Sequence, residues 1–326
     1  MGRQSRQTKS EACEDSWDRT SQDRVGTLTV VTRRHAQICT SSHQLEDAVL
    51  GARGLEACPG DKVSFNLDTS AGASKLVVHE ILERRNCLKR SSDRKTKLLV
   101  ANIDVLLVVV APPPLFNTIA IDRVLTAAAQ QAIPACIVLN KVDLKKHDDG
   151  TQALLATYRS AGCHCVETSA TTGEGMQALF ALLTQETLHA AAFTGISGVG
   201  KSTILRALLP EATIRTGEVS VRTGQGRQTT SQTVGHLFQR AATAPALLFD
   251  LPGVQQFGVC HLTESEVHAG FPELERLRSQ CKFSDCSHHA EPACAVREAV
   301  LQGALAASRY RSYLDMIKEI RAAARY

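Results

Sequence analysis

The sequence predicts a multidomain protein. It should have an all-β barrel near the N-terminus, a central α/β domain, and a mostly helical C-terminal domain that binds a metal ion. Three observations lead to this prediction. Short alternating segments separated by turn residues come first, apolar runs that alternate with helical stretches follow, and cysteine and histidine residues precede a helical C-terminus. With 326 residues, the chain can form two or three separate cores.

The composition is that of an ordinary globular protein, with 43% hydrophobic and 21% charged residues. A net charge of +4 permits contact with nucleic acid through local patches but does not by itself indicate it. The most apolar run, residues 98–115, contains Asn102 and Asp104 and is interrupted by three prolines, so we expect no membrane span. The odd number of cysteines, eleven, favours reduced thiols and a metal site over a disulfide framework. We therefore expect a cytoplasmic monomer without a membrane partner.

The N-terminal part is expected to contain an arm and a barrel. Residues 1–24 are polar with almost no apolar side chains, which predicts a disordered arm. Residues 25–92 are expected to form the barrel, with strands at residues 27–32, 36–40, 62–67 and 75–82. Basic residues between 84 and 95 follow the last of these strands. A solvated face is the ordinary interpretation of such a run, and a surface that contacts RNA phosphates is the alternative.

Residues 93–260 are expected to form the α/β domain. Apolar runs typical of strands buried on both faces occur at residues 105–111, 133–139 and 244–249. Helical stretches separate them at residues 121–131, 150–161, 175–189 and 202–209. This alternation predicts a mostly parallel sheet with helices on its faces.

A complete phosphate-binding loop follows the apolar residues 190–193. Its backbone N–H groups can turn onto phosphates, Lys201 can neutralise the β- and γ-phosphate charge, and the Ser202 hydroxyl can bind Mg²⁺. We assign nucleotide binding to Gly195, Ile196, Ser197, Gly198, Val199, Gly200, Lys201, Ser202 and Thr203.

Two further segments point to the terminal phosphate and its magnesium ion. Asp250 ends an apolar strand, where its carboxylate can reach Mg²⁺ through water, and Gly253 can bring its backbone N–H onto the γ-phosphate. Residues 226–230 lie between the phosphate loop and Asp250, where a switch segment is expected. We favour Thr230 as the additional Mg²⁺ ligand, with Thr229 as the alternative. A plain polar surface loop fits this composition equally well, so position alone supports the assignment.

A base-recognition segment, Asn140-Lys141-Val142-Asp143, follows the apolar run at residues 133–139. Asp143 can accept hydrogen bonds from the ring N–H and exocyclic amine that guanine offers and adenine does not. Asn140 would brace the loop, and the Lys141 stem would pack on the base. Ser169 and Ala170 can present a backbone N–H to the guanine carbonyl. These residues predict GTP as the ligand, with ATP as the weaker alternative.

The order of these motifs is unusual. In ordinary GTPases the phosphate loop precedes the base-recognition segment, whereas here Asn140 to Asp143 come well before Gly195. Both halves are present, but the order is inverted. The sequence therefore predicts a circularly permuted GTPase.

The C-terminal part, residues 261–326, contains a metal-binding pattern. Cys281, Cys286, His288 and Cys294 provide three thiolates and one imidazole, a set typical of tetrahedral structural zinc with no vacancy for catalytic water. His289 is a competing imidazole, and Cys260 is a more distant alternative ligand.

One helix is expected from residue 295 to about residue 325. Its packing side would carry Leu301, Leu305, Tyr310, Leu314 and Ile317. The side facing outward would carry Arg309, Arg311, Lys318 and Arg321.

With these motifs assembled, the chain resembles the ribosome small-subunit-dependent GTPase family (RsgA/YjeQ) over about residues 24–324. Residues 84–90 and 101–104 also look like the family. The resemblance implies an OB-fold barrel, a late role in 30S subunit maturation in contact with 16S rRNA, and GTP hydrolysis stimulated by the 30S particle. It also implies a water-positioning role at residue 228, where the family typically has His and this chain has Gln228. Gln can also orient water. The alternative is a nucleotide-gated RNA-binding protein with little turnover.

Overall fold

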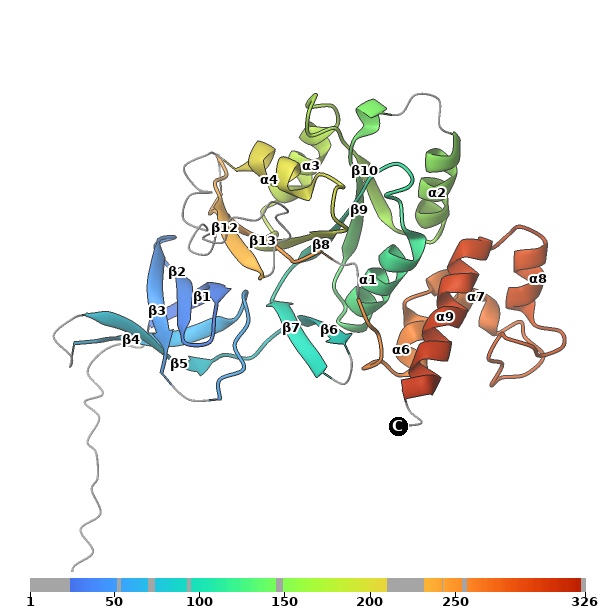
Figure 1. The fold of residues 1–326 in the computed structure, drawn as a ribbon, viewed down its shortest axis with the longest axis horizontal. Helices are drawn as coiled ribbons and strands as arrows, with labels where there is room; N and C mark the ends of the chain where they lie inside the picture. Colours follow the sequence, from blue (N-terminus) through green and yellow to red (C-terminus); the bar gives the residue numbers. More distant parts are fainter. Residues whose placement is uncertain are drawn as a thin grey trace, which may run out of the picture.

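The computed structural model describes residues 24–51, 54–69, 74–92, 95–144, 149–209, 232–241, 243–253 and 257–323. The expected N-terminal arm, apart from Arg24, lies outside these residues. So do Gln228, Thr229 and Thr230, whose expected roles stay predictions. Figure 1 shows the N-terminal barrel and the C-terminal helices on opposite sides of a central sheet. Within the described part of the chain, none of the helices has the length and apolar character that crossing a bilayer requires.

The N-terminal unit is a closed barrel of five strands in the order β1-β2-β3-β5-β4, which confirms the expected barrel. Its strands are β1 (Arg24–Val31), β2 (His35–Thr40), β3 (Leu45–Leu50), β4 (Lys62–Asp68) and β5 (Lys75–Ile81). Strand β3 was not expected, because Glu46 and Asp47 are exposed and Ala48 is its one buried residue. Leu28, Ile38, Phe65 and Val78 fill the interior.

A two-stranded hairpin, β6 (Cys87–Ser92) with β7 (Lys95–Ala101), connects the barrel to the rest of the chain. The boundary expected after residue 92 falls inside this hairpin. Arg84 and Arg85, just before it, pair with Asp61 and Asp104 at 2.6 Å and 2.7 Å. Two of the basic residues considered for RNA contact therefore form ion pairs that attach the segment before the hairpin to Asp61 and Asp104.

The central sheet has six strands in the order β10-β9-β8-β11-β13-β12, parallel except for β12. The strands are β8 (Val105–Val110), β9 (Ala135–Leu139), β10 (His164–Glu167), β11 (Ala190–Gly195), β12 (Val234–Phe238) and β13 (Ala246–Asp250). Strand β12 was not expected. It meets the barrel at Gly235, where an added Cβ would lie 3.1 Å from the Cβ of Thr29.

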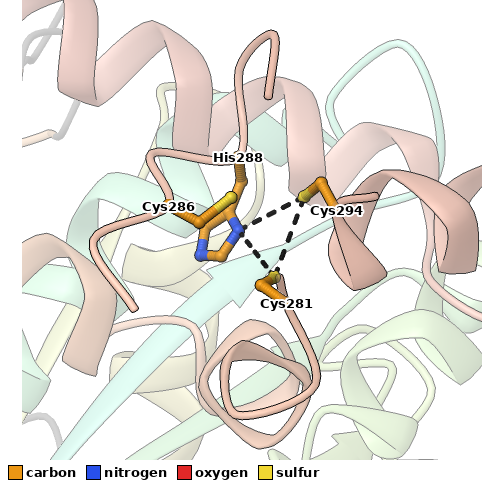
Figure 2. A group of neighbouring side chains, drawn as sticks. All are labelled: Cys281, Cys286, His288 and Cys294. Carbon is orange, nitrogen blue, oxygen red and sulfur yellow. Dashed lines mark hydrogen bonds between the residues drawn. The ribbon is translucent and has the colours of Figure 1, made fainter. Parts of the chain in front are cut away.

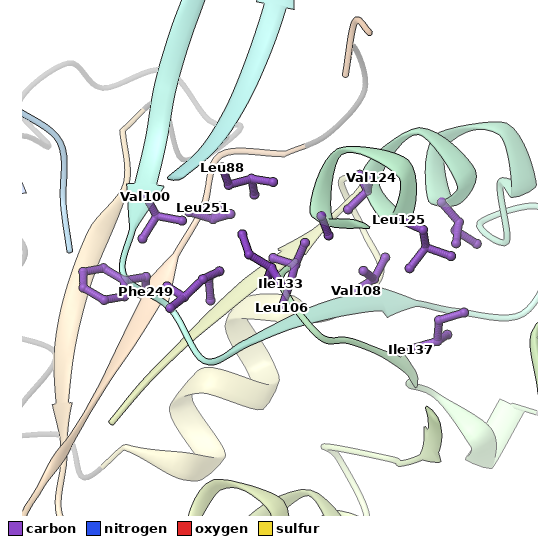
Figure 3. Packing of buried hydrophobic residues seen from close by; sticks show 14 of the residues in the cluster. Leu88, Val100, Leu106, Val108, Val124, Leu125, Ile133, Ile137, Phe249 and Leu251 are labelled. Atoms are coloured by element: carbon purple, nitrogen blue, oxygen red, sulfur yellow. The ribbon is translucent and has the colours of Figure 1, made fainter. Parts of the chain in front are cut away.

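Helices cover both faces of the sheet. They are α1 (Thr118–Gln130), α2 (Asp149–Ser160), α3 (Met176–Leu183) and α4 (Lys201–Leu208). Residues of α1 and α2, including Val124 and Leu155, pack in the core on one face, part of which Figure 3 shows. Residues of α3 and α4, including Leu179 and Ile204, pack on the other face. This two-sided burial explains the near-continuous apolar strands.

The C-terminal unit contains α6 (Glu264–Ala269), α7 (Pro272–Arg278), α8 (Ala295–Leu301) and α9 (Ala307–Ala323). The prediction of one helix from residue 295 to about residue 325 is wrong, because α8 ends before Gly303, which has a φ of +73°. Leu301, expected on the packing side, is 81% exposed. Leu305 and Ile317 are buried as expected, and Tyr310 and Leu314 pack against the same core. Tyr313, Met316 and Ile320 of α9 are also buried there.

Arg309 was expected to face outward and is instead only 2% exposed. Its guanidinium donates to Asp122 of α1 and to Glu273 of α7, both at 2.6 Å. It also stacks over the Phe271 ring at 4.3 Å. The hydroxyl of Tyr158, from α2, donates to the same Asp122 oxygen at 2.9 Å. A buried ion cluster therefore attaches the C-terminal unit to α1 and α2 of the central domain.

Replacing Arg309 with Met should lower the free energy of unfolding by about 3–5 kcal/mol, because the buried Asp122 and the half-buried Glu273 carboxylates lose their cation. The exposed Arg311, on the same helix, is the matched control, and Arg311→Met should change stability by no more than about 0.5 kcal/mol. Urea unfolding of both variants measures the difference. Equal losses would contradict the structural role assigned to Arg309.

Candidate nucleotide site and metal centre

The predicted nucleotide-binding residues lie at the carboxyl ends of parallel strands. Asn140 follows β9, Ser169 follows β10, the phosphate loop follows β11, and Asp250 ends β13. These strands are neighbours in one sheet, so their ends share an edge. Such an edge is where open α/β sheets bind ligands. The fold thus places both expected halves of the site on the same side of the sheet.

Close packing explains two glycines of the phosphate loop. Gly200 has a φ of +92°, and an added Cβ would lie 2.3 Å from the Nδ2 atom of Asn140. At Gly195 an added Cβ would lie 2.5 Å from the Val109 carbonyl oxygen. Both distances are too short for a side chain, so the loop can pass this close to its neighbours only with glycine. Ser197 and Gly198 at the tip are exposed.

The Asn140 side chain joins three segments of the site. Its Nδ2 donates to the Val199 carbonyl of the phosphate loop at 2.9 Å. Its Oδ1 accepts from the Ala170 backbone N–H at 3.0 Å and from the Thr168 hydroxyl at 3.4 Å. The side chain is only 2% exposed. One amide therefore connects the base-recognition segment, the phosphate loop and the turn after β10.

The remaining base-site candidates lie around this amide. Lys141 adopts a positive φ of 64°, and its Cε lies 3.7 Å from where a Cβ on Gly200 would be. Asp143 belongs to a short 3-10 helix, Val142–Leu144, and its side chain is exposed. Ser169 is buried, and its hydroxyl accepts from the Thr172 backbone N–H. Sequence reasoning missed Thr168, whose hydroxyl position depends on the fold.

Lys201 begins α4 and is 9% exposed. Its ammonium group donates to the Asp250 carboxylate and, at 2.7 Å, to the Leu251 carbonyl. Burial lowers the pKa of this ammonium to about 8. At neutral pH the ammonium group therefore remains mostly charged and can pair with anions. The structure brings Lys201 and Asp250 together, as expected of residues that share a triphosphate and its metal ion.

Two further candidates flank this pair. Gly253 lies against the phosphate loop, since an added Cβ would be 3.5 Å from the Gly195 carbonyl oxygen. Ser202, at the start of α4, is exposed, and its neighbour Thr203 is half-buried. The backbone of Gly253 and the hydroxyl of Ser202 are thus on the same edge as Lys201.

The four predicted metal ligands form one cluster, shown in Figure 2. The Sγ atoms of Cys281 and Cys294 lie 3.6 Å and 3.4 Å from Nδ1 of His288, and 4.0 Å from each other. With Cys286, all ligand atoms lie within 4.8 Å of one another. Thiolates bound to one tetrahedral zinc ion lie about 3.8 Å apart, given a Zn–S distance of about 2.3 Å. The cluster therefore has the size of a four-coordinate metal site.

Burial shifts the pKa values of two of these ligands in opposite directions. Burial raises the pKa of the Cys286 thiol to about 12, so its thiolate needs a positive partner at neutral pH. Burial also lowers the pKa of His288, which favours the neutral, ligating imidazole. The alternative ligands lie elsewhere: His289 is exposed, and the Cys260 thiol donates to Glu319 at 3.2 Å.

Hydrogen bonds hold the loop that carries His288. The Glu291 carboxylate accepts from the Ser287 hydroxyl and backbone N–H, and from the backbone N–H groups of His289 and Ala290. The hydroxyl of Tyr310, from α9, donates to the His288 carbonyl at 2.5 Å. The metal loop is thus tied to the helix that docks on the central domain.

Comparison with known proteins gives consistent matches. A model of the RsgA GTPase family matches residues 81–260. A small ribosomal subunit biogenesis GTPase RsgA from Paraburkholderia xenovorans (strain LB400) is 38% identical over 265 residues, 81% of this chain and 83% of that protein. The protein of the same name from Paraburkholderia phytofirmans is 37% identical over 303 residues, 92% of this chain and 94% of that protein.

Solved structures agree with these matches. The crystal structure of YjeQ from Thermotoga maritima superposes with a TM-score of 0.67 at 28% identity, covering 91% of this chain and 98% of that one. YloQ, described as a circularly permuted GTPase, superposes with a TM-score of 0.64 at 23% identity, covering 94% and 98%, which supports the fold alone. These matches confirm the resemblance drawn from the motifs: the chain belongs to the RsgA GTPase family.

Proposed function

We propose that this protein is a GTPase that binds the 30S ribosomal subunit late in its maturation and hydrolyses GTP to GDP with stimulation by that particle. The observation that carries the proposal is the Asn140 side chain, which joins the base-recognition segment to the phosphate loop. The family to which the chain belongs supports the activity, and the curated relatives carry small ribosomal subunit biogenesis in their names. On this view the GTPase domain is circularly permuted and the barrel is an OB-fold.

GTP binding would rearrange the Lys201–Asp250 pair. Lys201 would exchange the carboxylate for β- and γ-phosphate oxygens, and Asp250 would then face Mg²⁺ together with the Ser202 hydroxyl. Mg²⁺ would neutralise charge that develops on the phosphates. We propose Thr230, or Thr229, as a further Mg²⁺ ligand and Gln228 as the residue that orients the attacking water.

The basic hairpin is the proposed contact with 16S rRNA. Arg84 and Arg85 pair with carboxylates, and the Arg85 side chain is 59% exposed. Lys89 and Arg90 on β6 are half-buried, and Lys97 on β7 is exposed. Cations spaced along a two-stranded ribbon suit the phosphate backbone of RNA, since binding then depends on charge more than on base identity.

Phosphate release with and without purified 30S subunits tests the activity directly. We expect the subunits to raise GTP turnover, and Gln228→Ala to lower the stimulated rate by about a hundredfold because the attacking water loses its orienting group. The second candidate function, a nucleotide-gated RNA-binding protein, predicts tight GTP binding with little release under both conditions. An unchanged stimulated rate in Gln228→Ala would remove Gln228 from the mechanism.

Asp143→Asn should weaken GTP binding by about tenfold or more, because the carboxylate that accepts from the guanine edge is lost. Xanthine carries a carbonyl where guanine has its amine, so XTP binding should improve in the variant. Equilibrium binding of GTP, XTP and ATP to both proteins measures the change, with Asp315→Asn, on the exposed side of α9, as the control. An unchanged preference would contradict the base-reading role of Asp143.

We propose zinc as the ion of the cysteine–histidine cluster, because three thiolates and an imidazole suit it. The protein should then carry one zinc ion per chain. His288→Ala should lose the ion and lower the melting temperature by about 5 °C or more, because metal binding contributes folding free energy. His289→Ala, at the exposed neighbouring position, should keep the zinc ion and the melting temperature of the wild type. Metal analysis and thermal unfolding would reject the assignment if the two variants behaved alike.

A further inference from the structure

The segment that follows the proposed γ-phosphate contact is fixed at its far end. We call residues 257–261 the strap. Phe257 is buried and belongs to the same core cluster as Leu88 and Leu251. Gly258 forms a β-bridge with Ser91 of the hairpin, and an added Cβ there would lie 2.3 Å from the Ser91 carbonyl oxygen. Val259 belongs to the core of the C-terminal unit. The strap therefore contacts the central core, the hairpin and the C-terminal unit within three residues.

Arg123 of α1 and Glu319 of α9 hold the strap from two sides. Arg123 donates through Nη1 to the Phe257 carbonyl at 3.3 Å, and its Nη2 pairs with Glu319. Glu319 accepts at Oε1 from the Val259 backbone N–H at 3.3 Å and from the Cys260 thiol. The cation thus satisfies a strap carbonyl and the anion satisfies a strap N–H. The backbone groups of the strap therefore require the cation on α1 and the anion on α9.

The other end of this stretch is part of the nucleotide site. Gly253 lies against the Gly195 carbonyl, and the Leu251 N–H donates to the Phe193 carbonyl at 2.9 Å. Lys201 donates to the Leu251 carbonyl. Gly253 is therefore only four residues from Phe257, between an anchor in the sheet and an anchor on the strap. Over so short a distance, fixing both ends limits the positions that the Gly253 backbone can take.

We propose that Arg123 and Glu319 are positioning residues of the nucleotide site. They hold the strap so that the Gly253 N–H is ordered before the γ-phosphate arrives, which removes an entropic cost from binding GTP. GDP lacks the γ-phosphate, so its affinity does not depend on whether the Gly253 N–H is already ordered. The pair therefore sets how strongly the site distinguishes GTP from GDP. This inference rests on the proposed function, since it assumes that Gly253 contacts the γ-phosphate.

The pair also joins α1 to α9, and a purely structural role must be separated from the positioning role. Arg123→Met and Glu319→Met should each weaken binding of a non-hydrolysable GTP analogue by about tenfold while GDP affinity changes by less than about twofold. Intrinsic turnover should then show a raised KM for GTP. GDP binding also reports that each variant is folded. Equal losses for both nucleotides, or no loss for either, would overturn the proposal.

The exchanged pair, R123E/E319R, gives the sharper result. It restores an ion pair between α1 and α9 but presents a carboxylate to the Phe257 carbonyl and a guanidinium to the Val259 N–H. Thermal stability should therefore recover toward that of the wild type while binding of the GTP analogue stays weak. Recovery of analogue binding together with stability would show that only helix docking matters, and would overturn the proposal.

Arg321→Met is the matched control, because Arg321 lies on the same helix and pairs with Glu264 in an exposed position away from the strap. It should leave both nucleotide affinities unchanged, and a selective loss of analogue affinity in this variant would also overturn the proposal. Failure of 30S subunits to stimulate turnover would reject the proposed function, whereas the ratio of analogue to GDP affinity tests the positioning residues by themselves.

Discussion

The Asn140 side chain is the interaction on which the nucleotide site depends. It is buried, it donates to the phosphate loop, and it accepts from the turn after β10. An Asp at this position would keep the acceptor and lose the donor, and a Leu would leave the Val199 carbonyl and the Ala170 N–H unpaired. Asn140 and Val199 are 59 residues apart in the chain, so this contact joins two halves of the site that folding brings together.

The rest of the molecule is arranged around the same sheet by buried charge. Arg309 brings the C-terminal unit to α1 and α2, and Arg84 ties the segment before the hairpin to Asp61 in the barrel. Such pairs are weak contributors to net stability, but removing one partner is costly, because the other charge remains buried. Their effect is to specify how the units dock. The strap and the loop that carries His288 both hydrogen-bond to α9, so this helix connects the metal cluster region to the strap.

The buried Arg309 also shows why the side chains that face outward could not be predicted from residue type alone. Arg309, Arg311, Lys318 and Arg321 look alike in a helical pattern and were all expected to face outward. Whether an arginine is inside depends on Asp122 and Glu273, which lie far from Arg309 in the chain. The length of the C-terminal helix was the second error, because Gly303 interrupts the expected helix and Leu301, expected to pack, is exposed.

The sequence by itself determined what depends on local chemistry. Glycine spacing defined the phosphate loop, ligand spacing defined the metal cluster, and continuous apolar runs defined most of the parallel strands. It missed β3, β12 and the β6–β7 hairpin, since these strands have no strong alternation and form by pairing with neighbours. Only the tertiary structure decided which distant groups meet: Asn140 with Val199, Arg309 with Asp122, and Arg123 with Glu319. These contacts join residues far apart in the chain, and no local pattern encodes a partner that folding alone brings near.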